Sequence, residues 1–309
     1  MNSIEVTWSG NFVFLSYIFA FAGSFIGVCL GEQYRQCVIS HPQLLEANTI
    51  LWLMALSIGG VAIWSMHFIG MGAMILRDLD TNEIISVQFD VILTIVSLFV
   101  GIIFVYGGLL IATSDRVYMK NQQEFDAMMI ADAGKLSIKE AKSKQKLKFL
   151  ALFKGLSPLV IGGIFAAGGI CVMHYVGMMA QIFNVHMEWQ PGIISLSVII
   201  AVVASIAAFW IMFRLLPIFP QYESLRVACA FIMGIAVCGM HYCGIYGPKY
   251  TSSTTATTTY TIAVDSNSAV LSALAFGMIV LVIIHIISYA ELKSRLTRAS
   301  LVIKKIDVV

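Results

Sequence analysis

Seven long apolar stretches alternate with short polar segments along the chain. Each is long enough to cross a bilayer, because about 20 consecutive apolar residues span the hydrocarbon core as an α-helix. The pattern therefore predicts an all-α integral membrane protein with seven transmembrane helices, and no soluble domain of useful size remains between them. The stretches lie at roughly residues 11–31, 50–75, 90–113, 156–180, 192–213, 227–247 and 269–290.

Composition supports this class. Of the 309 residues, 59% are apolar and only 12% are charged, whereas about a quarter of the residues of a soluble domain are charged. A secretory signal peptide begins with a basic region, but the residues before the first stretch contain Glu5 and neither Lys nor Arg. We therefore expect the first stretch to be an uncleaved membrane anchor.

The basic residues are unevenly divided between the two sides of the predicted bundle. Orientation in a membrane follows the Lys and Arg residues of the short loops, which are enriched on the cytoplasmic side. One side has only Arg77 and Lys249, so we expect it to face outward. The N-terminus is then outside and the C-terminus cytoplasmic, as seven crossings require. The other side holds Arg35, Arg214, Arg226 and the basic residues of segment 114–150 and of the C-terminal tail.

Two polar segments stand out between the apolar stretches. Segment 114–150 is basic in its second half, with apolar residues at mixed spacing, which fits a solvated linker better than a surface helix on anionic lipid. Segment 248–268 is rich in Ser and Thr, which predicts a flexible or O-modified outer loop, or a lid over the outer face. The 6 cysteines are scattered without a CxxC pair, so a disulfide framework is not expected.

A pentad of the form Met-His-aromatic-x-Gly occurs near the end of the second, fourth and sixth stretches. The chain has only 6 histidines, so three copies indicate an internal repeat, with one motif in each of three helix pairs. A small residue seven positions before each histidine, with the glycine after it, makes a smooth strip for close helix contact. All three helices run outward from the cytoplasm, which places three imidazoles at one depth near the outer surface. The pentads begin at Met66, Met173 and Met240, and the small residues are Gly60, Ala167 and Gly234.

The residues around the three histidines are rich in sulfur. A methionine precedes each histidine, and in the first two copies another methionine follows one turn later on the same helix face. Cys171 and Cys238 stand one turn before their histidines. Imidazole, thioether and thiol form a soft ligand set that suits copper, above all Cu(I). The predicted metal ligands are Met66, His67, Met71, Met173, His174, Met178, Met240 and His241.

The motif has other interpretations. Two histidines on facing helices could ligate a haem iron, which is the weaker alternative. The histidines could instead hydrogen-bond across helix contacts while the methionines fill gaps, although three intramembrane ionisable residues at one depth favour a shared functional site. His186, in a short outer loop, fits a solvated residue better than an extra ligand, and His41 and His285 lie on the cytoplasmic side.

Several functional classes lack their required residues. No Asp, Glu, Lys or Arg lies at the centre of an apolar stretch, so the carboxylate relay of a proton-coupled transporter is not expected. The seventh stretch has no lysine for a retinal Schiff base. The sequence contains no Walker loop, no kinase or cyclase motif and no Ser/His/Asp set on a soluble scaffold, and we do not expect an enzyme.

The seven helices and the three motifs near the outer ends of the second, fourth and sixth helices resemble the MHYT family of integral membrane sensor domains. The resemblance covers about residues 11–290, and we expect one membrane domain over 1–290 and a short cytoplasmic tail over 291–309. It implies a copper site formed by the motif Met and His residues, and a role in sensing a diatomic gas such as oxygen, carbon monoxide or nitric oxide. The ligands that it implies are Met66, His67, Met173, His174, Met240 and His241.

The chain departs from the family pattern in two respects. Ile69, Val176 and Cys243 replace the threonine that ends the family motif, and Phe68 replaces the first tyrosine, which argues against a role for those hydroxyls. Bacterial members are usually followed by cytoplasmic output domains, such as diguanylate cyclases, cyclic-di-nucleotide phosphodiesterases or histidine kinases. The sequence ends before any such domain, so we expect the signal to leave through a cytoplasmic partner on segment 114–150 or on the basic tail.

The leading hypothesis is a multi-pass sensor of the plasma or inner membrane, with copper near its outer face, that senses a diatomic gas or redox state. A copper or small-molecule transporter would need a polar path inward, and the middle of the stretches offers little beyond Ser57, Thr94 and Ser205. A structural membrane protein, whose motifs only pack helices, is a further alternative. The expected partners are the lipid bilayer, the gas and the output partner, and no nucleic acid.

Overall fold

Seven helices in the described part of the chain are long and apolar enough to cross a membrane. The computed structural model describes residues 4–39, 45–114, 152–183, 185–219, 222–252 and 262–306. Each helix coincides with one of the seven apolar stretches, which confirms the predicted helical class and the spans. They are Gly10–Val38, Ala47–Met71, Val91–Thr113, Ser157–Met179, Pro191–Ile218, Glu223–Tyr246 and Ser266–Ser294.

Two of the spans contain a π-helical segment. Such segments are rare and often lie at functional sites, and the first of them, η1, ends directly before the first Met-His motif. The second span consists of α2 (Ala47–Ala55), η1 (Leu56–Ser65) and α3 (Met66–Met71), and the fifth of α8 (Pro191–Trp210), η2 (Ile211–Leu215) and α9 (Leu216–Ile218). The other spans lie within α1 (Gly10–Ile39), α4 (Val91–Thr113), α7 (Ser157–Met179), α10 (Glu223–Tyr246) and α11 (Ser266–Ile306).

Local sequence explains where several helices begin. The carboxylate of Asp90 accepts the backbone N–H of Leu93 at 2.8 Å and caps α4. Prolines stand in the first turn of α7 and of α8, where the missing N–H is not needed. Before α11, the carboxylate of Asp265 accepts hydrogen bonds from the hydroxyl and the N–H of Ser268. These hydrogen bonds lower the pKa of Asp265.

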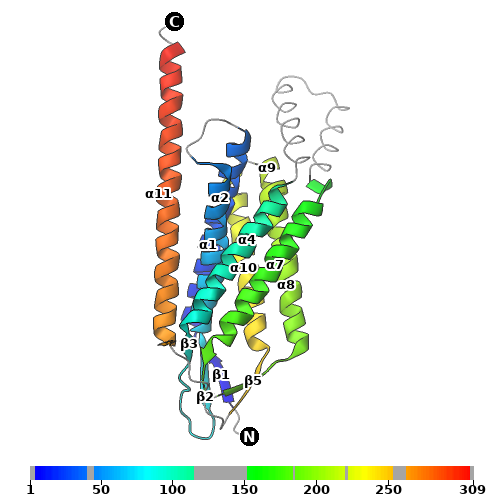
Figure 1. The fold of residues 1–309 in the computed structure, drawn as a ribbon, viewed down its shortest axis with the longest axis vertical. Coiled ribbons are helices and arrows are strands. Elements are labelled where there is room, and N and C mark those ends of the chain that lie inside the picture. Colours follow the sequence, from blue (N-terminus) through cyan, green and yellow to red (C-terminus); the bar gives the residue numbers. More distant parts are fainter. Residues whose placement is uncertain are drawn as a thin grey trace.

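The helices stand side by side in one bundle (Figure 1). The second span is the most deeply buried of the seven, whereas α11 is the least buried and stands at the edge. Helices α4 and α7 approach each other closely, since a Cβ on Gly108 would lie only 2.7 Å from the carbonyl oxygen of Gly162. Small residues of this kind let membrane helices pack backbone against backbone. The second span therefore forms the centre around which the other helices are arranged.

Three small antiparallel sheets gather at one end of the bundle, which we term the strand end (Figure 1). Strand β1 runs along β2, from Ile4 opposite Asp78 to Trp8 opposite Met74. Strand β3 lies between β4 and β7, and β5 pairs with β6. The strands are β1 (Ile4–Trp8), β2 (Met74–Asp78), β3 (Gln88–Asp90), β4 (Gln181–Ile182), β5 (Val185–Glu188), β6 (Lys249–Ser252) and β7 (Ala263–Asp265).

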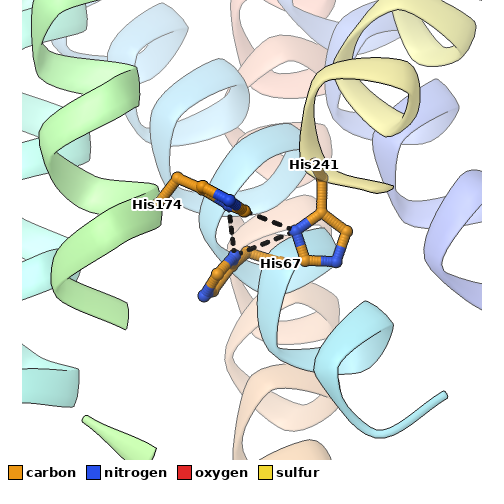
Figure 2. Close-up of side chains that lie close together, drawn as sticks. All are labelled: His67, His174 and His241. Carbon is orange, nitrogen blue, oxygen red and sulfur yellow. Dashed lines mark hydrogen bonds between the residues drawn. The ribbon is translucent and has the colours of Figure 1, made fainter. Parts of the chain in front are cut away.

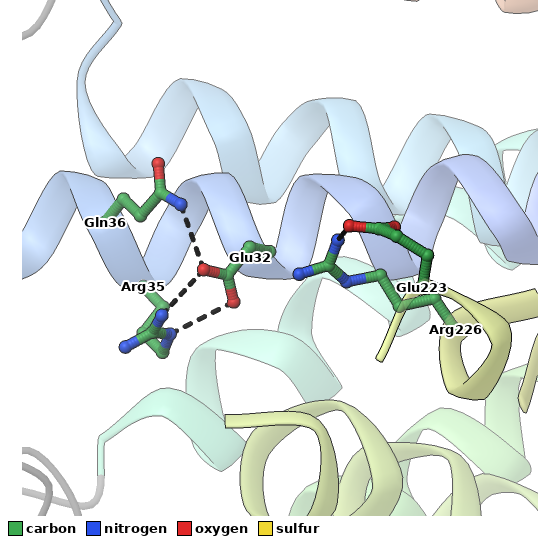
Figure 3. Close-up of polar contacts among 5 residues, drawn as sticks. All are labelled: Glu32, Arg35, Gln36, Glu223 and Arg226. Atoms are coloured by element: carbon green, nitrogen blue, oxygen red, sulfur yellow. Dashed lines mark hydrogen bonds and ion pairs between the residues drawn. The ribbon is translucent and has the colours of Figure 1, made fainter. Parts of the chain in front are cut away.

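The opposite end of the bundle carries ion pairs, and we term it the charged end. Within α1, Arg35 pairs with Glu32 at 2.6 Å, and at the start of α10 Arg226 pairs with Glu223 (Figure 3). These side chains mark the level at which polar groups replace the apolar surface of the helices.

The structure describes three of the predicted segments to different extents. Segment 114–150 lies outside the described residues except for Ser114. Segment 248–268 contributes β6 and β7, but its middle, 253–261, lies outside the described residues, so the predicted lid stays a prediction. The tail 291–309 continues α11 as helix to Ile306, so position 290 is not a break in the backbone.

Candidate metal centre

Three histidines from three spans meet inside the bundle (Figure 2). His67 comes from α3, His174 from α7 and His241 from α10, and each is only 1% exposed. The Nδ1 atom of His67 lies 3.0 Å from that of His241 and 3.2 Å from that of His174, and the third distance is 3.4 Å. The structure therefore brings together the three histidines of the motifs, which we term the triad, as their common depth predicts.

The same position in three similarly directed helices sets the common depth of the triad. The second, fourth and sixth spans run toward the strand end, and each histidine lies in the last two turns of α3, α7 or α10. In all three motifs the aromatic ring after the histidine packs edge-on against that histidine, with ring centres 4.9 Å apart. All three motifs thus have an aromatic ring after the histidine, but they do not all have a hydroxyl on it.

Each imidazole of the triad lies over the glycine of another motif, and the three contacts form a closed ring. A Cβ added to any of these glycines would meet the facing Nε2 atom far inside van der Waals contact. The sequence pattern predicts that these glycines permit close helix approach. In the structure, the space beside each glycine is instead occupied by the imidazole of another motif. The pairs are His67 with Gly177, His174 with Gly244, and His241 with Gly70.

The three rings form a propeller around a common centre. Their planes are inclined by 78° to 87° to one another. From the three Nδ1 separations, the point equidistant from all three atoms lies about 1.9 Å from each, close to the bond of about 2.0 Å between a metal and an imidazole nitrogen. When all three Nδ1 atoms are unprotonated, their lone pairs converge on this point and repel one another unless a cation lies between them.

Neutral histidines cannot satisfy all of these nitrogens among themselves. Each neutral ring carries one proton, and a hydrogen bond between two Nδ1 atoms needs one N–H and one lone pair. A ring without a proton on Nδ1 carries it on Nε2, and none of the three Nε2 atoms has a hydrogen-bond partner among the described residues. Every arrangement of protons therefore leaves at least one buried nitrogen unsatisfied, which costs about 1–3 kcal/mol.

A cavity of about 60 Å³ adjoins the triad. Its walls come largely from residues that precede the histidines in the second, fourth and sixth spans, together with residues of α8, so it extends from the triad toward the charged end. Apart from the triad, the hydroxyls of Ser24 and Ser205 are the only polar side chains among the described residues that line it. The site is therefore an apolar chamber with three nitrogen donors at one side.

The predicted sulfur ligands divide into two groups. Met66, Met173 and Met240 line the same cavity as the triad. Met71 and Met178 are buried in the core, at 2% and 0% exposure, but they are not among the described residues that line the cavity. The structure thus places the methionine before each histidine, rather than the one after it, beside the cavity.

The remaining candidates have other surroundings. Cys238 is buried beside Met66 in a small cluster that includes Ala20. Cys171 packs near Met240. His186 lies in β5 at the strand end and does not belong to the group that His67, His174 and His241 form.

Two hydroxyl contacts of the motifs could not be foreseen from the sequence. The hydroxyl of Tyr175 lies 2.6 Å from that of Ser197 and joins α7 to α8, and that of Tyr242 lies 2.8 Å from that of Ser16 and joins α10 to α1. A lone serine in an apolar stretch carries no sign of its partner. These hydroxyls therefore tie the motif helices to their neighbours, and Phe68 has no such bond to make.

Comparison with known proteins identifies the family. Residues 60–121 and 168–221 match the family model of MHYT, described as a bacterial signalling protein N-terminal repeat. The two regions contain the first and second motifs, with His67 and His174. These two regions of the chain are MHYT repeats. The resemblance seen in the sequence is thereby confirmed.

Curated relatives of this chain are signalling proteins. The bifunctional diguanylate cyclase/cyclic di-GMP phosphodiesterase MucR of Pseudomonas aeruginosa is 29% identical over 62% of the chain and 22% of its own length. Signaling protein YkoW of Bacillus subtilis is 26% identical over 80% of the chain and 25% of its own length. The cyclic di-GMP phosphodiesterase NbdA of P. aeruginosa is 22% identical over 77% of the chain and 24% of its own length. The chain therefore spans about a quarter of the length of these relatives. No solved structure matches it.

Proposed function

We propose that this MHYT protein is a membrane sensor that holds copper on its histidine triad and responds there to a diatomic gas or to redox state. The observation that carries the proposal is the triangle of buried Nδ1 atoms, whose common centre is about 1.9 Å from each nitrogen. The match to a bacterial signalling repeat supports the sensory role.

The surroundings of the triad support copper as the ion. No carboxylate is among the described residues that line the cavity, whereas Mg²⁺ and Ca²⁺ require oxygen ligands. The thioethers of Met66, Met173 and Met240 in the cavity wall favour a soft ion such as Cu(I). Haem fits less well, because a cavity of about 60 Å³ is far smaller than the roughly 300–1,000 Å³ of sites for larger ligands.

The residues of the chain would hold and shield the ion. His67, His174 and His241 offer nitrogens from three helices in the neutral form, which introduces no buried charge before metal binds. Their Nε2–H groups then face the glycine backbone. The apolar walls exclude bulk water and leave room for a molecule of two atoms, since one water occupies about 30 Å³. Bound copper would supply a coordination position for such a gas and a one-electron redox couple.

The triad also links three spans to one another. Its three nitrogens belong to α3, α7 and α10, so a displacement of any of them shifts one span against two others. Packed helices of this kind respond by moving between discrete arrangements. The second span is the most buried of the seven and transmits such a shift to its neighbours.

We further propose that the strand end faces outward and that the signal leaves at the charged end, in a plasma or inner membrane. Arg77 in β2 and Lys249 in β6 are few against the basic residues of the other side, as the positive-inside rule requires. MucR and NbdA act, by name, on cyclic di-GMP. An output that makes or degrades this nucleotide, reached through segment 114–150 or the tail 291–309, is the partner we propose.

A transporter is less well supported than a sensor. It would need polar side chains from the triad to the charged end, and the cavity on that side is apolar except for the hydroxyls of Ser24 and Ser205.

Metal analysis of the purified protein tests the copper site. The chain in detergent, loaded with Cu(I) and desalted, should retain about one copper ion per chain, since the three nitrogens share one centre. His67→Asn, His174→Asn and His241→Asn should each lose it. His186→Asn, in β5, is the matched control and should retain it. A wild-type chain that retains no copper after loading, or a triad variant that retains as much as wild type, would contradict the proposal.

A further inference from the structure

One face of α11 carries exposed side chains in a heptad spacing. From Leu271 to Ile306 the positions advance by four and three residues alternately, the interval of a left-handed coiled-coil seam. Every member whose side chain the structure describes is exposed. The seam consists of Leu271, Ala275, Met278, Val282, His285, Tyr289, Leu292, Leu296, Ala299, Ile303 and Ile306.

Most of the seam lies on the side of α11 that faces away from the bundle, while His285, Tyr289 and Leu292 border a hollow that Gln33 and Gln36 of α1 also line. The side of α11 that packs on the bundle carries Ala273, Gly277, Ile284 and Glu291, which also recur at helical spacing but on the opposite side of the helix. Figure 1 shows α11 at the edge of the bundle, with its later turns extending beyond the other helices. The described side chains of the seam, from Leu271 to Leu296, are therefore exposed to a neighbour.

Lipid covers only part of this seam. Gln33 and Gln36 of α1 and Glu291 of α11 line one hollow at the charged end, at the level of the ion pair between Glu32 and Arg35 (Figure 3). Because charged and hydroxyl residues become frequent on α11 from here on, we place the edge of the hydrocarbon at this level.

The apolar surface of α11 changes width at this level. Before it, Ile279, Ile283 and Ile286 are exposed beside the seam, which is the broad apolar surface that lipid requires. After it, Leu292 and Leu296 are 54% and 63% exposed, while charged or hydroxyl residues occupy every position between them and for two positions beyond. A narrow stripe of this kind is typical of a coiled-coil seam rather than of a lipid-facing helix.

We propose that α11 pairs with α11 of a second copy of this chain, in a parallel two-helix coil that begins in the membrane and continues beyond the charged end. Copies inserted in the same orientation have parallel α11 helices, so each seam residue meets itself at the same depth, as a two-fold axis requires. His285 is a polar residue within an otherwise mostly apolar seam, which is the arrangement that fixes the register of a parallel pair.

The residues that flank the seam are compatible with identical partners. In a parallel coil, the residue just before every second seam position, such as Tyr289 or Leu296, pairs with the residue five positions further along the other helix. By heptad position, Ser288 then pairs with Lys293 of the other copy, and Arg295 with Ser300. Like charges do not meet directly in these pairs, so the identical helix is an acceptable partner.

Cysteine cross-linking in membranes tests the pair. The full chain carrying Leu292→Cys or Leu296→Cys should form a covalent dimer with a short bismaleimide. Ala290→Cys and Thr297→Cys are matched controls, because both positions are exposed at the same level but lie off the seam, and they should stay at or near the background of the parent chain. Equal yields at all four positions, monomer at all four, or a product containing a different protein would overturn the proposal.

A second measurement guards against variants that fail to fold. Wild type in mild detergent should have the mass of a dimer by light scattering, and Leu292→Lys with Leu296→Lys should have that of a monomer, while Thr297→Lys should stay dimeric. The metal content of the lysine variant should equal that of wild type, because the triad lies elsewhere in the bundle. A wild-type monomer at every protein concentration would contradict the pair.

Discussion

Each histidine of the triad occupies the space that a side chain on its facing glycine would need. Gly177→Ala should therefore displace His67, whose Nε2 atom lies where the new methyl group would be. We expect a loss of about 1–3 kcal/mol in the free energy of unfolding, which is typical of overpacking. Copper affinity should fall about 10- to 100-fold, as it does when groups that support a ligand are changed. Thermal unfolding and copper titration in detergent measure the two effects.

A matched control exists on the same helix. Gly168 in α7 has no atom within 4 Å of the position a Cβ would take, so Gly168→Ala adds a methyl group to open space. It should retain copper and gain up to about 1 kcal/mol, because alanine favours a helix over glycine. Equal behaviour of Gly177→Ala and Gly168→Ala would contradict the proposed contact between the glycine and the imidazole.

At the residue scale the sequence predicts the members of the site better than their contacts. The common depth of His67, His174 and His241 follows from helix direction and motif position alone, and the structure brings them together. The lateral order of the helices is not encoded in the spacing. For this reason, the contact of each imidazole with a glycine of another motif could not be derived, although the glycine was visible in each motif.

At the scale of elements, η1 sets the position of the first motif, and its packing depends on Gly59. A Cβ on Gly59 would lie 2.8 Å from the carbonyl oxygen of Gly101 in α4. This oxygen belongs to the backbone, so it cannot move aside by a side-chain rotation. Gly59→Ala should therefore destabilise the protein by about 1–3 kcal/mol. It should also weaken copper binding, because His67 follows η1 directly.

The neighbouring glycine provides the comparison for this prediction. A Cβ on Gly60 would lie 3.1 Å from the ring of Phe276, and a side chain can yield by a few tenths of an ångström. Gly60→Ala should accordingly cost less than Gly59→Ala in the same thermal unfolding experiment. The reverse order would show that the backbone contact between η1 and α4 is not what limits substitution here.

Apolar length predicts the spans, but not the details within and between them. The seven helices follow from hydropathy because the bilayer imposes length and apolarity on each. The π-helical turns of η1 carry no composition that separates them from α-helix. The strands at the strand end are only two to five residues long, so an alternating pattern is barely visible in them. The charged residues after Glu291 indicate a tail, yet the backbone there stays helical.

At the scale of the whole molecule, the site and the proposed pairing surface lie in different parts of the bundle. The triad lies toward the strand end of α3, α7 and α10, and the last turns of α11 extend past the charged end (Figure 1). Helix α11 packs on η1 and α3, the elements that precede and contain His67. A displacement of the first motif therefore acts directly on the helix that carries the proposed interface between copies, without a separate relay.

The orientation of the bundle decides which compartment the site samples, and it can be measured. If the strand end faces outward, as the basic residues predict, Lys249→Cys in β6 should react with a membrane-impermeant maleimide in intact cells, since this position is exposed. Thr297→Cys, exposed at the other end, should react only after the cells are permeabilised. The parent chain with its 6 native cysteines gives the background. The opposite labelling pattern would place the triad near the cytoplasmic face and the proposed coil of α11 outside, where it could not reach a cytoplasmic output.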